Sequence, residues 1–155
     1  MKQCKVAITR LFRAPRERVF EAWTQARHLA CWFGPNGFTF PSCEADARPG
    51  GVFTLCMRSP EGKDYWVRGV YREARPPERV VITCTLHDEH GVPRVDELIE
   101  VTLAEHDGQT SLELLATCSG RGDEAAAMLG RMPKGWSQTI ARLSSHFIPI
   151  RDKEM

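Results

Sequence analysis

The feature that most constrains the fold is an unbroken succession of strand-like segments in the middle of the chain. Residues 38–47, 51–58, 64–74, 79–86, 95–104 and 110–118 are the predicted strands. Short turn-forming sequences separate them, among them Pro49-Gly50-Gly51, Pro76-Pro77 and Asp107-Gly108. Turns of this length join antiparallel neighbours, because a parallel crossover needs about a dozen residues or more. The sequence therefore predicts an antiparallel meander.

A further strand and two short helices are predicted ahead of this meander. Residues 4–13 alternate in polarity, with Val6, Ile8 and Phe12 on one face. Residues 15–23 and 26–33 have apolar side chains at helical spacing. The second of these helical segments ends at the turn 34–37, Gly-Pro-Asn-Gly, which is a strong helix breaker.

The chain returns to a helical pattern after residue 119. Asp123 and Glu124 place acidic side chains in a first helical turn, where they complement the helix dipole. Pro133 interrupts the pattern, so we expect a short helix, a break or kink near Met132-Pro133, and a long helix to about Phe147. An apolar stripe follows the long helix at i, i+4, i+7 and i+11, formed by Trp136, Ile140, Leu143 and Phe147.

These elements together predict one α+β domain of the helix-grip type over residues 1–150, with a short polar tail at 151–155. In this fold a curved antiparallel sheet wraps around the long C-terminal helix, whose apolar stripe closes the concave face. A curved sheet and a straight helix diverge toward one end, so we expect a mostly apolar cavity of a few hundred Å³ between them.

Charge and targeting signals narrow the classes of function. The chain of 155 residues has 21 Lys+Arg and 20 Asp+Glu, a balance that offers neither a nucleic-acid footprint nor a polybasic membrane patch. No signal-peptide core and no apolar run long enough to cross a bilayer are present, which predicts a soluble cytoplasmic protein. The six cysteines lack Cys-x-x-Cys spacing, so we interpret them as reduced thiols that mostly fill the core.

Three stretches resemble one known family. They are ITRLFRAPRERVFEAWT near the N-terminus, CWFGPNGFTFPSCEADARPGG and the strands that follow it, and KGWSQTIARLSSHF near the C-terminus. Together they are similar, over nearly the whole chain and in the same order, to bacterial homologues of the activator of heat-shock protein 90 ATPase (AHSA1-like). These homologues belong to the START/Bet v 1-like (SRPBCC) superfamily. The resemblance implies the helix-grip fold, a ligand-sized cavity and no built-in cofactor, but superfamily members differ widely in function.

Arg10 is the first candidate site residue, because it lies in phase with the apolar face of its strand. Burying a guanidinium is costly unless the group is paired and hydrogen-bonded. Arg10 could therefore bind an anionic ligand inside the cavity. Alternatively, it could form a structural ion pair with an inward carboxylate such as Glu97, or reach water at a strand edge.

Aromatic and sulfur-containing side chains supply the other candidates, because small-molecule pockets are lined in this way. The same side chains could simply fill the core. The expected ligand-binding residues besides Arg10 are Trp32, Phe33, Phe53, Met57, Tyr65, Tyr71, Trp136 and Ile140. The turn 34–37, together with Trp32 and Phe33, is expected to form the rim of the cavity.

Motifs for metal binding and catalysis give little support to either. His87 and His90 have H-x-x-H spacing but lie in an expected hairpin turn, so we predict no metal site there. No nucleophile elbow and no phosphate-binding loop occurs, and no catalytic residue is assigned.

The leading hypothesis is a domain that binds a small apolar or amphipathic molecule, with no cofactor, nucleic acid or membrane as partner. One alternative is a protein-interaction module that resembles a chaperone ATPase activator. The other is a cyclase or hydrolase-like enzyme that uses polar groups in the cavity. The sequence leaves a homodimer open as well. A solid interior would favour the interaction module, and converging Arg, Glu and Tyr groups in a cavity would favour the enzyme.

Overall fold

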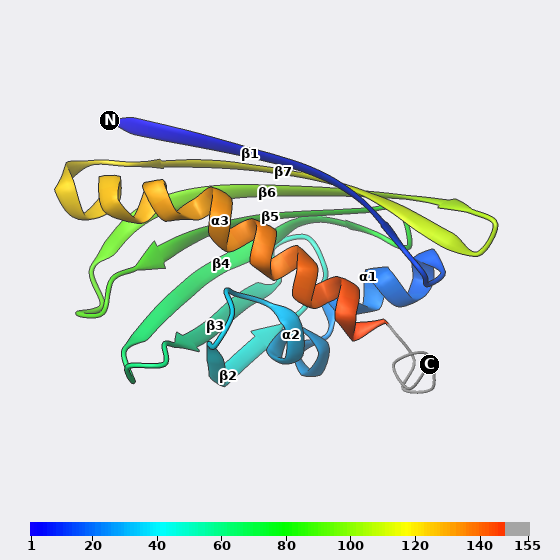
Figure 1. The fold of residues 1–155 in the computed structure, drawn as a ribbon, viewed down its shortest axis with the longest axis horizontal. Helices are drawn as coiled ribbons and strands as arrows, with labels where there is room; N and C mark the ends of the chain where they lie inside the picture. The colour runs from blue at the N-terminus through cyan, green and yellow to red at the C-terminus, as the bar shows by residue number, and fades with distance from the viewer. Residues whose placement is uncertain (148–155) are drawn as a thin grey trace.

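One antiparallel sheet forms the body of the molecule in a computed structural model that describes residues 1–147 (Figure 1). Its seven strands are arranged in the order β1-β7-β6-β5-β4-β3-β2. Their bounds are β1 Lys2–Phe12, β2 Thr39–Ala45, β3 Val52–Arg58, β4 Asp64–Arg75, β5 Arg79–His87, β6 Pro93–His106 and β7 Gln109–Gly120. The predicted tail 151–155 and the predicted domain end at 150 lie outside the described residues.

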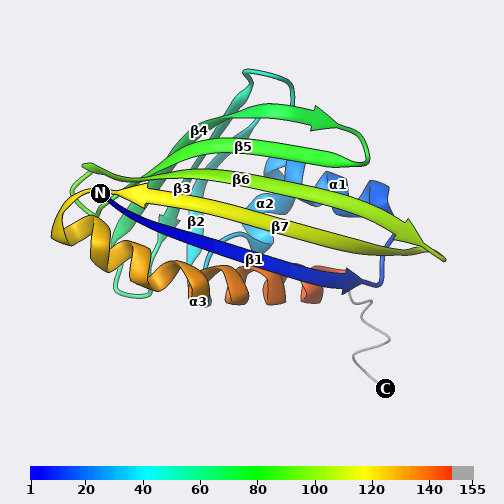
Figure 2. The same cartoon turned by 90° about the horizontal axis from the view of Figure 1, so that it is seen from above.

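The three helices lie on one side of this sheet. The long helix α3, Gly122–His146, runs along the concave face, and in the view from above it follows the β1 edge of the sheet (Figures 1 and 2). Helices α1, Arg16–Thr24, and α2, Ala26–Trp32, follow β1 and connect it to β2 at the other edge of the sheet. The structure therefore confirms the helix-grip architecture, in which a curved sheet holds a C-terminal helix.

The predicted strands agree with the observed ones to within about two residues at most ends, and the two short helices also lie where expected. Of the predicted break or kink near Met132-Pro133, the break is wrong, because α3 is continuous through Pro133. Proline disrupts a helix because it lacks the N–H that would bond to the carbonyl four residues earlier. Here Leu129 and Trp136 are buried on either side of Pro133, so packing against the sheet holds both halves in one helix.

Alternation along the strands determines which side chains enter the core. On β6, for example, Val95, Glu97 and Ile99 point inward in turn, and all three are buried. The backbones of β4 and β5 approach each other closely at Gly69. A Cβ atom added at Gly69 would lie 2.1 Å from the carbonyl oxygen of Thr83. This position therefore requires glycine for the two backbones to approach each other.

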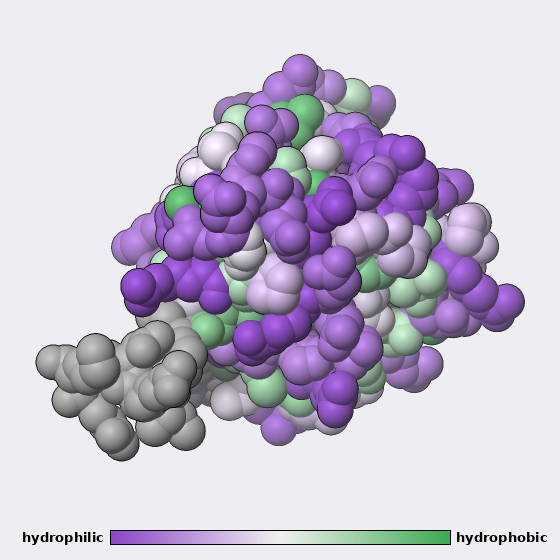
Figure 3. All heavy atoms as spheres, turned by 90° about the vertical axis from the view of Figure 1, so that its right-hand side faces the viewer, coloured by the Kyte–Doolittle hydropathy of each residue, from purple (hydrophilic) through white to green (hydrophobic). Residues whose placement is uncertain are grey.

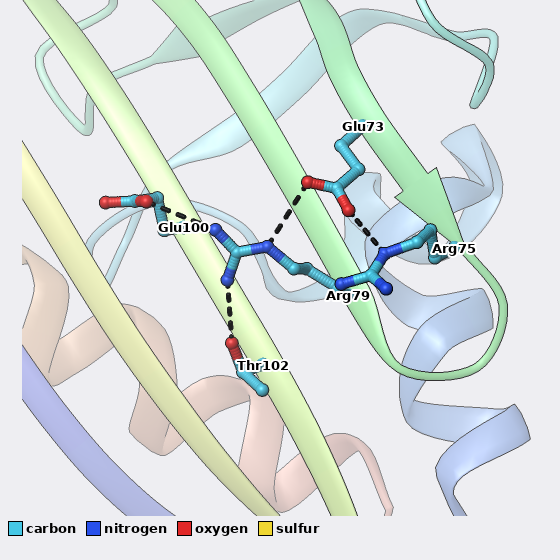
Figure 4. A network of polar contacts seen from close by, with 5 residues as sticks. All are labelled: Glu73, Arg75, Arg79, Glu100 and Thr102. Carbon is cyan, nitrogen blue, oxygen red and sulfur yellow. Dashed lines mark hydrogen bonds and ion pairs between the residues drawn. The ribbon is translucent and has the colours of Figure 1, made fainter.

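The outer face of the sheet carries charged side chains that join neighbouring strands (Figure 4). Arg79 on β5 contacts Glu73 of β4 at 3.3 Å and Glu100 of β6 at 3.2 Å, and donates to the hydroxyl of Thr102 at 2.9 Å. Glu73 also pairs with Arg75. Cross-strand ion pairs of this kind fix the pairing of β4, β5 and β6 but add little stability because water reaches them.

The end of the molecule near α1 and the β6–β7 turn is covered mainly by hydrophilic residues, with small scattered apolar areas (Figure 3). Single apolar residues of this kind are normal on protein surfaces. Among residues 1–147, no helix is long and apolar enough to cross a membrane.

Candidate functional site

A cavity of about 350 Å³ lies between α3 and the half of the sheet formed by β3–β6. The α3 side chains Met128, Met132, Trp136 and Thr139 form one wall. The opposite wall comes from the sheet and the segment that follows α2, and its members are Phe33, Pro35, Phe38, Met57, Tyr65, Val67, Leu86 and Glu97. The size is within the usual range for small-molecule sites, and most of the lining is apolar.

The lining changes in character from the deep end of the cavity to its mouth. Val67, Trp136 and Glu97 are buried, whereas Glu61 and Arg131 are exposed. A ligand would thus enter past charged side chains that remain in water and would contact apolar side chains inside. Among the described residues that line the cavity, Glu97 is the one buried ionisable side chain.

Glu97 lies at the centre of a cross-strand row of small side chains. It is directly opposite Cys84 on β5 and Cys118 on β7, and Gly69 lies opposite Cys84 on β4. Residues opposite one another on one face of an antiparallel sheet are neighbours. Small neighbours on both sides leave space above the carboxylate, so it can face both Trp136 on the helix and the cavity.

Hydrogen-bond donors surround the Glu97 carboxylate. Nε1 of Trp136 donates to Oε2 at 2.7 Å, and the thiols of Cys118 and Cys84 donate weakly at 3.5 Å to Oε2 and 3.8 Å to Oε1. Burial raises the pKa of Glu97, and the donated hydrogen bonds oppose that rise only in part. Burial also raises the pKa of both thiols, which therefore remain protonated donors. In the described part of the chain, no lysine, arginine or histidine forms an ion pair with Glu97.

Trp136 is held in position by aromatic neighbours. Its ring stacks on Trp23 with centroids 6.3 Å apart and meets Phe33 edge-on at 5.8 Å. These contacts orient the indole so that its N–H points to Glu97 while its face remains on the cavity wall. A ligand in the cavity would contact Trp136 directly.

The rim segment after α2 is fixed to α3 by a guanidinium. Nη1 of Arg142 donates to the carbonyl oxygens of Phe33, Gly34 and Pro35 at 2.9–3.3 Å, and Nη2 donates to that of Cys31 at 3.1 Å. These include carbonyls at the C-terminal end of α2, which have no partner within the helix. Arg142 therefore both caps α2 and holds one wall of the cavity.

Four of the expected ligand-binding residues do line the cavity: Phe33, Met57, Tyr65 and Trp136. Four others, Trp32, Phe53, Tyr71 and Ile140, do not line it and lie in the packed core. For two of these the polar tip has a structural partner. Trp32 donates to the carbonyl of Ala22 and Tyr71 to that of Trp23, each at 2.9 Å, which satisfies carbonyls near the end of α1.

Arg10 does not form the ion pair with Glu97 that was one of its expected roles. Arg10 lies on the inward face and is largely buried, as its position in the alternation predicts. Within residues 1–147, however, it forms no ion pair, and it is not among the cavity residues. Arg10 is paired in register with Leu112 on β7, at the edge of the sheet, whereas Glu97 lies opposite Cys118 on the same strand. Of the residues expected at the rim, Phe33, Gly34 and Pro35 line the cavity, whereas Trp32, Asn36 and Gly37 are not among its lining residues.

Sequence reasoning gave Glu97 only as a partner for Arg10 and did not include it in the site. The signal was nevertheless present, because a glutamate between Val95 and Ile99 in an alternating strand must point inward. The methionines Met128 and Met132 of α3 were also missed. Their helical turn precedes the recognised apolar stripe and is separated from it by Pro133.

The turn between β5 and β6, which contains His87 and His90, is held together by the carboxylate of Asp88. Asp88 pairs with Arg94 at 2.8 Å and accepts hydrogen bonds from the backbone N–H groups of Val92 and His90, and these contacts lower the pKa of Asp88 to about 2. The carboxylate thus closes the hairpin turn. No group of three or more His, Cys, Asp or Glu side chains suited to a metal ion occurs in the described residues.

Comparison with protein families gives one match, which extends over residues 13–147, to the activator of Hsp90 ATPase homolog 1-like proteins. The chain belongs to this family. None of the curated proteins compared with the chain matches it in sequence. The family assignment and the fold therefore agree with the resemblance seen in the sequence.

Solved structures of bacterial proteins share the fold. A protein from Chromobacterium violaceum is 28% identical, with a TM-score of 0.73, and the match covers 94% of this chain and 98% of that one. A protein from Nitrosomonas europaea is 23% identical, with a TM-score of 0.75 and 92% of each chain covered. The AHSA1 protein from Silicibacter pomeroyi is 23% identical, with a TM-score of 0.73, 92% of this chain and 96% of that one being covered.

Proposed function

We propose that this domain binds a small apolar or amphipathic molecule in the cavity between α3 and the sheet. The observation that carries the proposal is the cavity of about 350 Å³ itself, within a core that is otherwise filled by large buried side chains. At about 30 Å³ for a water-sized group, the space would accept roughly a dozen non-hydrogen atoms. Its apolar walls would favour a hydrocarbon or aromatic body.

The two rival functions have less support. The family description refers to an activator of a chaperone ATPase, but a protein-interaction module would not need a cavity of this size. An enzyme would be favoured by converging acid and base groups, and Glu97, Tyr65 and Arg131 do line the same cavity. Glu97 bonds to Trp136 and the two thiols, however, and neither Tyr65 nor Arg131 is hydrogen-bonded to it in the described structure. Binding without chemistry is therefore the preferred function.

Isothermal titration calorimetry with 1-octanol as the ligand tests the proposal. A ligand of this size should bind with a dissociation constant of about 0.1–1 mM and with a negative heat-capacity change, the marker of apolar burial. Two substitutions on α3 provide a matched pair. Gly135→Phe adds a ring inside the cavity, whereas Gly130→Phe adds one at an exposed position on the same helix.

We expect Gly135→Phe to weaken octanol binding about tenfold or more, and Gly130→Phe to leave it within about twofold. Circular dichroism of both variants would establish that they are folded. Equal binding by the two variants, or no saturable binding by the unmodified protein, would rule out the cavity as the binding site.

A further inference from the structure

The Glu97 carboxylate is buried in the cavity wall without a positive partner. Its side chain belongs to a residue only 5% exposed, and among residues 1–147 it is in no ion pair. A buried charge without a counter-ion is costly, so such a group either takes up a proton or is balanced by a cation, a metal or a ligand. The position of Glu97 in the cavity lining directs attention to a ligand.

The hydrogen bonds around Glu97 indicate which chemical group would suit it. The three side chains that bond to it, Trp136, Cys84 and Cys118, all donate. A protonated carboxyl group would need an acceptor for its own O–H, and among the described side chains bonded to Glu97 only the thiol sulfurs, which are weak acceptors, could serve. The strong donor Trp136 and the lack of a strong acceptor suit oxygens that accept hydrogen bonds.

The two carboxylate oxygens are not equally occupied. Oε2 accepts the 2.7 Å bond from Trp136 and the bond from Cys118, whereas Oε1 has only a long thiol contact of 3.8 Å. A carboxylate oxygen can accept two hydrogen bonds. Oε1 thus retains the capacity for a strong donor that enters with a ligand.

We propose that the ligand is an amphipathic amine, with an apolar body in the Met- and Phe-lined cavity and a protonated nitrogen donating to Glu97. This inference rests on the proposed binding function and assigns the class of ligand for the same cavity. An ammonium group would supply both the missing positive charge and the missing donor, and such charge-assisted hydrogen bonds are about twice as strong as neutral ones. The carboxylate Glu61 at the mouth adds negative potential along the entry path, and Arg131 opposes it.

Three ligands with the same eight-carbon chain test the assignment: octylamine, 1-octanol and octanoic acid. Calorimetry at pH 7 should show octylamine binding about tenfold or more tightly than octanol, and octanoic acid most weakly. Glu97→Gln removes the charge and keeps the shape. This variant should lose most of the preference for octylamine over octanol. Glu61→Gln is the matched control, because it removes a carboxylate from the mouth and should leave most of the preference for the amine.

The outcomes separate this inference from the proposed function. If none of the three ligands binds, the proposed function fails. If octanol and octylamine bind equally, or if octanoic acid binds most tightly, the cavity remains a binding site but the assignment of an amine is overturned. Loss of the amine preference in Glu61→Gln rather than Glu97→Gln would also overturn it, because the attraction would then arise at the mouth. The comparison among ligands uses the unmodified protein, so it decides the question even if Glu97→Gln does not fold.

Discussion

The indole Nε1 of Trp136 donates a 2.7 Å hydrogen bond to Oε2 of Glu97, and this bond joins α3 to β6 at the wall of the cavity. Both residues are 5% exposed. A carboxylate in this position depends on its donors, because removing one of them leaves a buried acceptor without its partner. The bond therefore contributes to stability and at the same time sets the polarity of the candidate binding site.

Trp136→Phe should destabilise the protein by about 1–3 kcal/mol, because it removes the main donor to a buried carboxylate. Urea unfolding followed by circular dichroism measures the change. Trp66→Phe provides the control, since Trp66 is only partly buried and its ring lies against Arg68, with the Arg68 guanidinium 4.4 Å from the ring centroid. A loss for Trp136→Phe no larger than that for Trp66→Phe would contradict the importance of the bond.

The stability of the protein should fall with rising pH through the ionisation of Glu97. Burial raises the pKa of this carboxyl group above its ordinary value of 4.5, so the folded state binds its proton more tightly than the unfolded state does. Its favourable contribution is complete below pH 4.5 and is lost as pH rises through the pKa of the folded state. The free energy of unfolding of Glu97→Gln, relative to that of the unmodified protein, should therefore increase from pH 4 to pH 9. A pH-independent difference would show that burial does not shift this group.

The pair His28 and His146 should make the protein less stable as the pH falls, which is opposite to the effect of Glu97. Nδ1 of His28 and Nε2 of His146 lie 3.0 Å apart between α2 and the end of α3. Burial, the neighbouring His28 and Arg18 lower the pKa of His146 below its ordinary value of 6.5. The contribution of His146 to stability is thus present above pH 6.5 and is lost as pH falls through its pKa in the folded state. Between pH 7 and pH 5, the urea midpoint of His146→Gln should therefore fall less than that of the unmodified protein. Equal falls in the two midpoints would contradict the prediction.

Tyr71→Phe should cost about 1–3 kcal/mol without changing ligand affinity. The hydroxyl of Tyr71 satisfies the buried carbonyl of Trp23, which would be left without a partner. Tyr65→Phe is the matched control, because the Tyr65 ring lines the cavity and no hydrogen bond of its hydroxyl is present in the described structure. Its unfolding free energy should change by less than about 0.5 kcal/mol. Thermal and urea unfolding would show the difference, and octanol titration would show whether Tyr71 takes part in binding.

Two glycines of α3 should respond to alanine with opposite signs. A Cβ atom at Gly130 or at Gly122 would meet no atom within 4 Å, so neither substitution creates a clash. Gly130 lies within the helix, where alanine should add about 0.5–1 kcal/mol. Gly122 has a φ of +89°, a backbone conformation that costs L-residues about 1 kcal/mol or more. Denaturation midpoints that shift in the same direction for both variants would contradict this account of the start of α3.

The fold could be predicted from the sequence because its signals are local and repeated. Each strand between residues 38 and 118 alternates in polarity and ends at a turn, and the apolar stripe from Trp136 to Phe147 gives the final helix. Pro133 is the exception. Local preference predicts a break or kink there, but α3 continues through Pro133 with Leu129 and Trp136 buried on either side, so tertiary packing outweighs the local preference for a break.

The residues that line the cavity were harder to predict from the sequence, because they depend on where the side chains fail to fill the core. Phe53 and Tyr65 look alike in an alternating pattern, yet Phe53 is fully buried in the core and Tyr65 faces the cavity. Alternation places Glu97 inside but does not give its neighbours, which depend on the register of β5, β6 and β7. The role of Arg142 likewise follows from the close approach of α3 to the rim segment, which are more than 100 residues apart.

The most direct test of the central claim uses the indole N–H signal of Trp136 in a ¹⁵N NMR spectrum during titration with octylamine. The chain has four tryptophans, and comparison with Trp136→Phe identifies the signal. The account predicts that this signal moves saturably, because the indole both lines the cavity and bonds to Glu97, whereas the signal of Trp66 stays in place. If the signal of Trp136 does not move, or if all four move together without saturation, the cavity is not the binding site.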